Sequence, residues 1–547
     1  MKLALAQFNP TVGDIAGNVE KMAALIARAA REGADLTVFG ELAVVGYPPR
    51  DLLRKERFVR DSEAAVEALA RACTGTAALV GFVRPTPGHA GRPLQNCAAL
   101  IADGKIRHVH AKTLLPTYDV FDESRYFEPG LASGCIAFGA VRLGLSVCED
   151  LWDAVALGRK LYGADPIAAL IAEGADLIIN MSASPYEMAK AARREELFAR
   201  QVARTGATLV YVNQVGGNDE LIFDGGSCVV GPDGRVIARA RGFAEDLLLV
   251  DLPAGGGRIE PLGTPIERLS EALKLGLRDY VRKCGFAKVV LGLSGGIDSA
   301  VVATLAADAL GGENVIALAM PSRYSSDHSL SDAQGLARNL GLKYRVVPIE
   351  PMHSAYEKSL ADVLADGRAD LAAENVQARI RGAIVMAVSN ATGALPLATG
   401  NKSELATGYC TLYGDMCGGL APIGDVYKTI VYDLARHLSA ESGGGRIPVG
   451  SLTKPPSAEL KPNQVDQDKL PPYDVLDAIL SRYIEEDQTA EQIVADGFDP
   501  AVVRDTIRMV DLSEYKRKQA APVLKATSRA FGTGRRMPIA QRYRPPG

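Results

Sequence analysis

The chain has 547 residues, too many for one ordinary hydrophobic core, and this length predicts roughly two to four domains. Hydrophobic residues make up 47% and charged residues 23% of the sequence, as in soluble globular proteins. The net charge of −4 argues against nucleic acid and against an anionic membrane surface as partners.

Neither the N-terminus nor the cysteines indicate export. The first residues, Met1–Gln7, become polar too early for a signal peptide and are more typical of a strand. No apolar run is long enough to span a bilayer. The eight cysteines include no Cys-x-x-Cys pair, which argues against a structural zinc site and is consistent with reduced thiols. We therefore expect a cytoplasmic protein.

The first half of the chain alternates short apolar runs with amphipathic helical patterns. This alternation predicts a layered α/β domain. Helices are expected over Asn18–Glu32 and Ala189–Thr205. Strands are expected over Lys2–Phe8, Leu36–Phe39, Ala77–Phe82, Ile106–His110, Val141–Val147, Leu177–Asn180 and Thr208–Asn213, with a hairpin over Val229–Val236.

Three polar residues follow directly after expected strands: Glu41, Lys112 and Cys148. Such positions are where ligands usually meet a sheet. Glu41 can take the thiol proton as general base, and Lys112 can lower the thiol pKa and stabilise an oxyanion. The thiolate of Cys148 would then attack an amide and form a thioester that water hydrolyses. The alternative is that Cys148 is simply a small core residue.

A glycine-rich break separates the two halves. Pro253–Gly257 lacks apolar periodicity, and we place the linker around residues 253–265. A helix near residues 266–284 and a strand over Lys288–Leu293 then begin a second α/β unit. The predicted domains are residues 1–255 and 262–547.

The strongest local pattern in the second half is Ser-Gly-Gly-Ile-Asp-Ser over Ser294–Ser299, directly after the expected strand. Its glycines allow a sharp turn, and the backbone N–H groups at the following helix N-terminus can bind an anion. Asp298 would repel a phosphate unless a cation lies between them, which predicts Mg²⁺. No Gly-Lys-Ser/Thr closes the loop, so it is not a Walker A motif. A tight turn without a ligand is the alternative.

This loop resembles the pyrophosphate loop of the ATP pyrophosphatase family, whose members cleave ATP to AMP and pyrophosphate. Five later motifs, taken in order, are similar to the synthetase domain of the NAD⁺ synthetases: Asn375–Arg381 (expected to open a helix), Thr399–Glu404, Pro422–Thr429, Lys454–Leu460 and Tyr515–Gln519. The long basic segment after Lys518 departs from that pattern, and its role is open.

The resemblance implies a Rossmann-like parallel sheet and specific ligand contacts in the second domain. It implies ATP binding by Gly292, Leu293, Ser294, Gly295, Gly296, Ile297, Asp298, Ser299 and Thr399. It implies deamido-NAD⁺ binding by Asn375, Glu404 and Lys516, and Mg²⁺ binding by Asp298 and Glu404. Candidates to balance the phosphate charges are Lys402, Lys428, Lys516, Arg517 and Lys518.

In the first domain, Glu41, Lys112 and Cys148 resemble the catalytic residues of the nitrilase superfamily. The resemblance implies an α-β-β-α sandwich, often dimerised, and therefore a homo-oligomer. It makes Glu123 the counterpart of a supporting second glutamate. It further implies glutamine contacts by Tyr118, Ser184 and Lys190.

Together the two halves resemble the glutamine-dependent NAD⁺ synthetases over nearly the whole chain. Such an enzyme would use glutamine, ATP and deamido-NAD⁺ as small-molecule substrates. It would adenylate deamido-NAD⁺, amidate it to NAD⁺, and release AMP, pyrophosphate and glutamate. Because free ammonia would protonate and escape, we expect it to pass internally, through a tunnel, from the first site to the second.

Two alternatives remain at this point. One is another glutamine-dependent amidotransferase with the same loop, of the asparagine or GMP synthetase type. The other is a non-catalytic first domain, which would leave glutamine-dependent activity intact when Cys148 is replaced.

Overall fold

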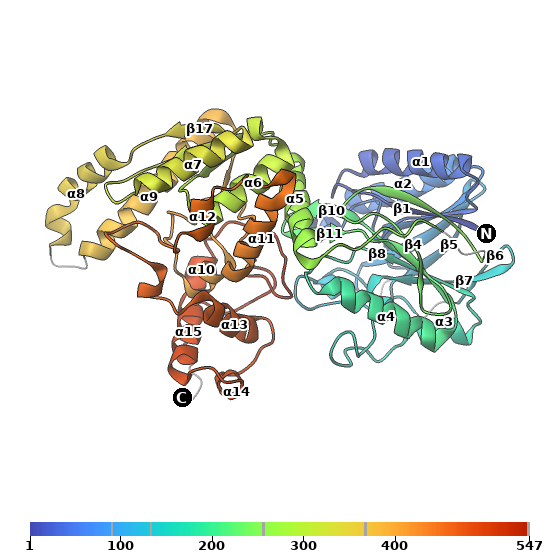
Figure 1. Ribbon diagram of the computed structural model, residues 1–547. Helices are drawn as coiled ribbons and strands as arrows, with labels where there is room; N and C mark the ends of the chain where they lie inside the picture. Colours follow the sequence, from blue (N-terminus) through green and yellow to red (C-terminus); the bar gives the residue numbers. More distant parts are fainter. Residues whose placement is uncertain (89–90, 132–133, 254–256, 366–368, 544–547) are drawn as a thin grey trace. The chain divides into compact units, whose positions relative to one another are not determined.

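The computed structural model describes residues 1–88, 91–131, 134–253, 257–365 and 369–543 (Figure 1). It consists of two compact units, Met1–Gly263 and Thr264–Gly547. Residues 254–256 of the predicted linker, and with them the predicted first-domain boundary at residue 255, lie outside the described residues.

The first unit contains two six-stranded sheets, ordered β14-β1-β2-β3-β4-β5 and β13-β12-β9-β8-β7-β6, and a small hairpin of β10 and β11. Its strands are β1 (Lys2–Gln7), β2 (Leu36–Val38), β3 (Ala77–Pro85), β4 (Leu94–Ala102), β5 (Lys105–Ala111), β6 (Ile136–Phe138), β7 (Val141–Val147), β8 (Leu177–Ser182), β9 (Thr208–Asn213), β10 (Val215–Asn218), β11 (Leu221–Asp224), β12 (Cys228–Val230), β13 (Val236–Arg239) and β14 (Asp246–Asp251). Its helices are α1 (Ile15–Arg31), α2 (Glu56–Ala72), α3 (Pro166–Ala172) and α4 (Lys190–Thr205), with 3₁₀ turns η1 (Arg50–Arg54), η2 (Glu123–Arg125) and η3 (Cys148–Leu151).

The alternation of side chains along β1 shows how the layers are built. Leu3 and Leu5 belong to a buried cluster that joins residues of both sheets. Ala4 and Ala6 point to the opposite face, where they pack with Met22 of α1. On the second sheet, α3 and α4 cover the outer face (Figure 1). The order of layers is therefore helices, sheet, sheet, helices, and the predicted α-β-β-α sandwich is confirmed.

Most expected strands of this unit are present, but β4, the second pairing partner of β3 beside β2, was not predicted. Strand β4 pairs antiparallel with both β3 and β5. Its sequence includes Ala98, Ala99 and Ala102, and alanine has a low β propensity. The strand forms because pairing on both edges and burial outweigh this weak local preference.

The second unit is built on a parallel four-stranded sheet, ordered β17-β16-β15-β18, which confirms the predicted Rossmann-like architecture. Its strands are β15 (Val289–Gly292), β16 (Val315–Ala319), β17 (Lys343–Val346) and β18 (Leu395–Leu397). Its helices and 3₁₀ turns are α5 (Pro265–Lys283), α6 (Ile297–Leu310), η4 (Gly312–Asn314), α7 (Asp327–Leu340), α8 (Glu350–Leu364), α9 (Ala369–Thr392), α10 (Lys402–Thr407), α11 (Lys428–Ala440), η5 (Glu441–Gly443), α12 (Val449–Thr453), η6 (Asp466–Asp468), α13 (Tyr473–Ile484), α14 (Ala490–Ala495), α15 (Pro500–Leu512) and α16 (Glu514–Arg517). The helix expected to open at Asn375 instead begins six residues earlier, at Ala369.

Helix α6 follows β15 and carries the glycine-serine loop at its N-terminus. Ala300, Val301 and Val302 are fully buried, and the helix itself carries apolar residues on every side. It packs against α5, α11, β15 and β16. The loop is therefore held at the end of a central, rigid helix.

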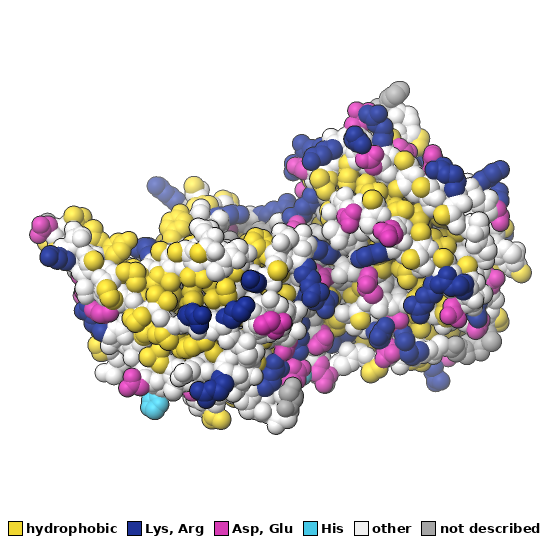
Figure 2. Space-filling model, turned by 90° about the horizontal axis from the view of Figure 1, so that it is seen from above, with side chains coloured by type: hydrophobic (Ala, Val, Ile, Leu, Met, Phe, Trp, Pro, Cys, Tyr) yellow, Lys and Arg dark blue, Asp and Glu magenta, His cyan; other side chains and the backbone are white. Residues whose placement is uncertain are grey.

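On the face shown in Figure 2, lysine and arginine side chains are interspersed with aspartate and glutamate. Charges of both signs at short spacing largely cancel at a distance. Within the described ranges, no helix is both long and apolar enough to cross a bilayer.

Candidate active sites

The first site gathers residues that follow three different strands. Glu41 follows β2, Lys112 follows β5, and Cys148 follows β7. The Lys112 ammonium donates to Glu41 Oε1 at 2.7 Å and to Glu123 Oε1 at 2.8 Å. All four side chains are buried, so these charge-assisted bonds are shielded from water. The structure thus brings together the four residues predicted to be catalytic.

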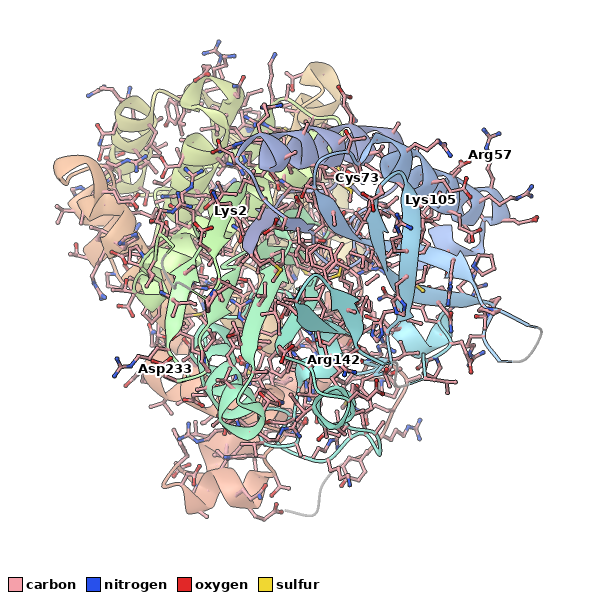
Figure 3. The ribbon with its side chains drawn as sticks, turned by 90° about the vertical axis from the view of Figure 1, so that its right-hand side faces the viewer. Lys2, Arg57, Cys73, Lys105, Arg142 and Asp233 are labelled. Carbon is pink, nitrogen blue, oxygen red and sulfur yellow. The ribbon has the colours of Figure 1, made fainter. Side chains whose placement is uncertain are left out.

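The position of this site follows from the direction of the strands. Figure 3 looks at the side of the first unit where Lys2, Lys105 and Arg142 lie at or near the beginnings of β1, β5 and β7. Lys112 and Cys148 come after the other ends of β5 and β7. The site is therefore at the carboxyl ends of the strands, the usual position for ligands in α/β domains.

The charges around Lys112 keep it cationic and keep the thiol neutral. Burial lowers the pKa of Lys112, but Glu123 and Glu41 raise it well above its ordinary value. Burial and then Glu41 raise the pKa of Cys148 well above its ordinary value, while Lys112 acts in the opposite direction. Lys112 does lower the thiol pKa, as expected, but this effect is smaller than the rise caused by burial and Glu41. The resting thiol must therefore give its proton to a base before it can attack.

Glu123 is the most unusual acid of the cluster. Burial and the neighbouring Glu41 raise its pKa to about 7, although Lys112 and a hydrogen bond from Tyr47 lower it. Its charge therefore changes close to neutral pH.

The backbone at the nucleophile is strained and firmly held. Cys148 has φ 44°, in the left-handed region that few residues other than glycine adopt. Asp150 accepts from the Val147 amide at 2.9 Å with one oxygen, and from the Thr113 and Leu114 amides at 3.0 and 2.7 Å with the other. A single buried carboxylate thus connects the end of β7, next to Cys148, to the residues directly after Lys112.

Two of the predicted glutamine contacts, Tyr118 and Lys190, act on Glu149, a carboxylate that the sequence analysis missed. The Tyr118 hydroxyl donates to both oxygens of Glu149, at 2.9 and 3.0 Å, and Tyr162 donates to one of them at 3.0 Å. Burial raises the pKa of Glu149, and Lys190 is among the groups that lower it. Adjacency to Cys148 was the available signal for Glu149.

Ser184, the third predicted glutamine contact, lies just beyond β8 and is buried. Its amide donates to Asn213 at 2.8 Å, and Asn213 donates back to its carbonyl at 3.2 Å. Its backbone position is therefore set by β9, which ends at Asn213.

The second site is a cavity of about 300 Å³ at the carboxyl ends of β15, β16 and β18. Every residue predicted to contact ATP lines it except Gly295. Gly295 instead makes the turn: its φ is 82°, and a Cβ there would lie 2.3 Å from the Ser329 carbonyl oxygen. Within the loop, the Ser294 and Ser299 hydroxyl oxygens are 3.1 Å apart.

Asp298 is the centre of a polar network in this cavity. Asn401 donates to one of its oxygens at 2.9 Å, and Lys428 forms an ion pair with the other. The Lys428 ammonium is also 3.7 Å from Glu404. Burial and the charge of Asp298 raise the pKa of Glu404 to about 8. The carboxylates of Asp298 and Glu404 thus both face the Lys428 ammonium. The sequence did not predict that Asn401 takes part in this network.

Asn375 and Lys516 are placed differently from the other predicted contacts. In the described part of the chain, neither belongs to the cavity wall. Asn375 accepts from the hydroxyl of Thr411, a residue of the wall, at 2.9 Å. The Lys516 ammonium donates to the carbonyls of Gly408 and Cys410 at 2.7 and 2.8 Å.

Both halves of the chain match known families. Residues 2–258 match the carbon-nitrogen hydrolase family, and residues 269–520 match the NAD synthase family. A glutamine-dependent NAD(+) synthetase from Synechocystis is 50% identical over 100% of this chain and 99% of its own length. One from Thermotoga maritima is 43% identical, with the same coverage. The chain belongs to the glutamine-dependent NAD⁺ synthetase family. The predicted resemblance is confirmed.

A solved structure from this family agrees with the fold over both units. The glutamine-dependent NAD⁺ synthetase of Acinetobacter baumannii, in complex with ADP, is 39% identical and superimposes with a TM-score of 0.78. The match covers 98% of each chain. That relative binds an adenine nucleotide, in keeping with the use of ATP by this family.

The residues at Asp298 fit a magnesium ion that is partly held by phosphates. Within the described residues, no cluster of three or more His, Cys, Asp or Glu side chains is arranged for a metal. Mg²⁺ commonly binds one or two carboxylates and completes its coordination with phosphate oxygens and water. Asp298 and Glu404 provide two such carboxylates. Burial, and then the charge of Asp298, raise the pKa of Glu404, and a bound cation would offset both effects.

Proposed function

We propose that this protein makes NAD⁺ from deamido-NAD⁺, using ATP and glutamine and releasing AMP, pyrophosphate and glutamate. The observation that carries the proposal is the full-length match to glutamine-dependent NAD⁺ synthetases. A buried Glu-Lys-Cys cluster and a glycine-serine phosphate loop, each in its own unit, support it. Neither an asparagine or GMP synthetase nor a non-catalytic first domain would account for that match.

In the first unit, Glu41 takes the proton of the Cys148 thiol, and the thiolate attacks the amide carbon of glutamine. Lys112 remains cationic between Glu41 and Glu123 and stabilises the oxyanion of the tetrahedral intermediate. Ammonia leaves with a proton returned by Glu41, and water hydrolyses the thioester to glutamate.

Glutamine is recognised by Tyr118, Ser184 and Lys190, together with Glu149. The buried Glu149 carboxylate lies beside the nucleophile and can accept from the α-ammonium group of the substrate. Lys190 can pair with the α-carboxylate. Such pairing would select glutamine over a simple amide.

In the second unit, the nicotinate carboxylate of deamido-NAD⁺ attacks the α-phosphorus of ATP and releases pyrophosphate. Backbone N–H groups of the Gly292–Ser299 loop and the side chain of Thr399 hold the phosphates. Asp298 and Glu404 would hold Mg²⁺, which neutralises phosphate charge when bound. Asn375 and Lys516 take part in deamido-NAD⁺ binding at the Thr411–Asp415 side of the cavity. Ammonia then displaces AMP from the adenylate.

Three further properties belong to this proposal. Ammonia passes internally to the adenylate without equilibrating with the solvent, because protonated ammonia cannot attack. The protein forms a homo-oligomer, which light scattering would detect. It works in the cytoplasm, where ATP and glutamine are available.

One isotope experiment tests the reaction and the transfer of ammonia together. The protein is incubated with ATP, Mg²⁺, deamido-NAD⁺, glutamine labelled with ¹⁵N in its amide, and an equal concentration of unlabelled ammonium. Mass spectrometry is expected to find AMP, pyrophosphate and NAD⁺ with the label retained. Unlabelled NAD⁺ in proportion to the free ammonium would exclude internal transfer, and no NAD⁺ at all would exclude the proposed function.

A further inference from the structure

A fully buried charge of the second unit, that of Lys402, lies outside the cavity. The side chain does not belong to the described cavity wall. Its ammonium donates to the Thr527 hydroxyl at 2.5 Å and the Arg529 carbonyl at 3.0 Å, and lies 3.0 Å from Asp425. It also donates to Glu485 at 2.9 Å. Lys402 thus points away from the cavity, and the sequence-based expectation that it balances phosphate charge is not met.

Two of the four partners of Lys402, Thr527 and Arg529, belong to the basic C-terminal segment whose role the sequence left open. Asp425 is also fully buried and accepts from the Ala526 and Thr527 amides, both at 2.8 Å. The Thr527 hydroxyl lies between the two charged groups, within 3.0 Å of either Asp425 oxygen. The segment is therefore attached to the interior and is not a loose tail.

The residues just before that segment, Ser513–Arg517, hold the other end of α10. Ser513 donates to the Thr407 carbonyl at 3.1 Å, and Arg517 donates to the Leu405 and Ala406 carbonyls at 3.2 and 2.7 Å. Lys516 donates to the carbonyls that follow. These are the carbonyls that a helix leaves without intrahelical partners at its C-terminus.

Helix α10 has six residues, too few for a helix to be stable by itself. It nevertheless carries residues of the ATP site. Asn401, its N-cap, donates to Asp298, and Glu404 in its first turn lines the cavity beside Lys428. Lys402 lies between these two residues in the chain, so its side chain anchors the turn that presents them.

We propose that residues 513–531 act as a clamp on both ends of α10, and that Lys402 is a positioning residue for ATP binding. The clamp holds Asn401 and Glu404 at Asp298 before any ligand arrives. This inference rests on the proposed function, because it assigns the clamp to the ATP site of that reaction. It gives the C-terminal segment a role in nucleotide affinity.

The test removes one hydroxyl from the clamp and an equally buried hydroxyl elsewhere in the unit. Thr527→Val keeps the shape of the side chain but removes its bonds to Lys402 and Asp425. Thr506→Val is the matched control, because the Thr506 hydroxyl on α15 is buried and no hydrogen-bond partner for it lies in the described part of the chain. The Kd for ATP with Mg²⁺ is measured by calorimetry, which requires no turnover.

We expect Thr527→Val to weaken ATP binding about tenfold, the factor that corresponds to about 1.4 kcal/mol, and Thr506→Val to leave it within about twofold. Hydrogen exchange at the amides of residues 401–408 is expected to accelerate in Thr527→Val alone. In ammonium-dependent turnover the KM for ATP should rise more than kcat falls.

Two outcomes separate failure of the inference from failure of the proposed function. If Thr527→Val lowers the melting temperature but leaves the ATP Kd and exchange over α10 unchanged, the clamp is only structural and the inference is wrong. If the unmodified protein binds no ATP, the proposed function fails first. Lys402→Met, which leaves Asp425 and Glu485 without their cation, is expected to weaken ATP binding further; should it not fold, Thr527→Val still decides the question.

Discussion

The two sites differ in how much open space they enclose, and this difference matches the chemistry of each. In the first unit, Lys112 binds Glu41 and Glu123 directly, and the buried Cys148 lies within electrostatic reach of all three. In the second, the loop residues line a cavity of about 300 Å³ whose polar groups surround Asp298. Release of ammonia from one small amide needs few groups held tightly, whereas two nucleotides need a wide surface of phosphate-binding groups.

This contrast predicts that a change in one site should leave the isolated chemistry of the other intact. The first site depends on the proton affinity of a few buried side chains. The second depends on backbone N–H groups and on the balance of charge at Asp298. Ammonium salts can replace glutamine as nitrogen source, so the two chemistries can be measured separately.

The largest effect is expected for the nucleophile. Cys148→Ala should lower glutamine-dependent NAD⁺ formation at least about 10⁴-fold, since no thioester can form. Ammonium-dependent formation should stay within about twofold of the unmodified protein. Cys73→Ala is the control, because Cys73 is also buried but precedes β3, at the strand-beginning edge of the sheet. Glutamine use that survives Cys148→Ala would exclude the proposed glutaminase.

The reciprocal change is in the second site. Asp298→Asn should lower the ammonium-dependent rate about 100-fold, because the cavity loses the carboxylate shared by Asn401 and Lys428. Glutamine hydrolysis measured without nucleotides should be unchanged. Asp308→Asn is the matched control on the same helix, where the carboxylate pairs with Arg446 instead. An equal loss in both variants would point to a folding defect of α6.

A smaller effect is expected for Asp150, whose carboxylate joins the end of β7 to the residues after Lys112. Asp150→Asn should lower glutaminase kcat about tenfold to 100-fold, because weaker bonds to the Val147, Thr113 and Leu114 amides let the nucleophile and Lys112 move apart. The KM for glutamine should change less than kcat. Asp153→Asn, three residues along and paired with Arg200, serves as control. An unchanged kcat would show that Asp150 does not position the nucleophile.

The smallest effect concerns pH. A carboxyl group is ionised above its pKa, and that of Glu123 is about 7, so its ion pair with Lys112 forms as the pH rises and is lost as the pH falls. Glutaminase kcat/KM should therefore rise about tenfold from pH 6 to pH 8. In Glu123→Gln the profile should be nearly flat over this window and lower than the plateau of the unmodified protein. The same slope in both proteins would assign the titration to another group.

Much of both sites could be predicted because the signals are local. Glu41, Lys112 and Cys148 each directly follow an expected strand, and the loop at Ser294 combines glycines with hydroxyls directly before a helix. Glu149 was missed although it adjoins the nucleophile, because its two tyrosine partners are 31 and 13 residues away in the chain. Such partners cannot be found from the periodicity of one sequence.

Among the basic residues of the second unit, the sequence instead assigned to the site residues that do not belong to it. Lys402 and Arg517 were candidates for phosphate binding because they lie in or beside family motifs. In the structure, Lys402 binds the C-terminal segment, and Arg517 binds the end of α10 and Glu514. A motif locates a residue in the chain but does not say which way its side chain points.

The sequence by itself determined the two α/β domains, most of the strands expected in the first, the site residues that directly follow strands, and the family. These depend on short-range preferences: apolar periodicity, glycine in turns, and hydroxyls and carboxylates at helix starts. Only the tertiary structure decided the charge states and the supports of the sites. Burial and distant partners set the neutral thiol of Cys148, the pKa of Glu123 and the anchoring of Lys402, and these arise only once segments far apart in the chain have packed together.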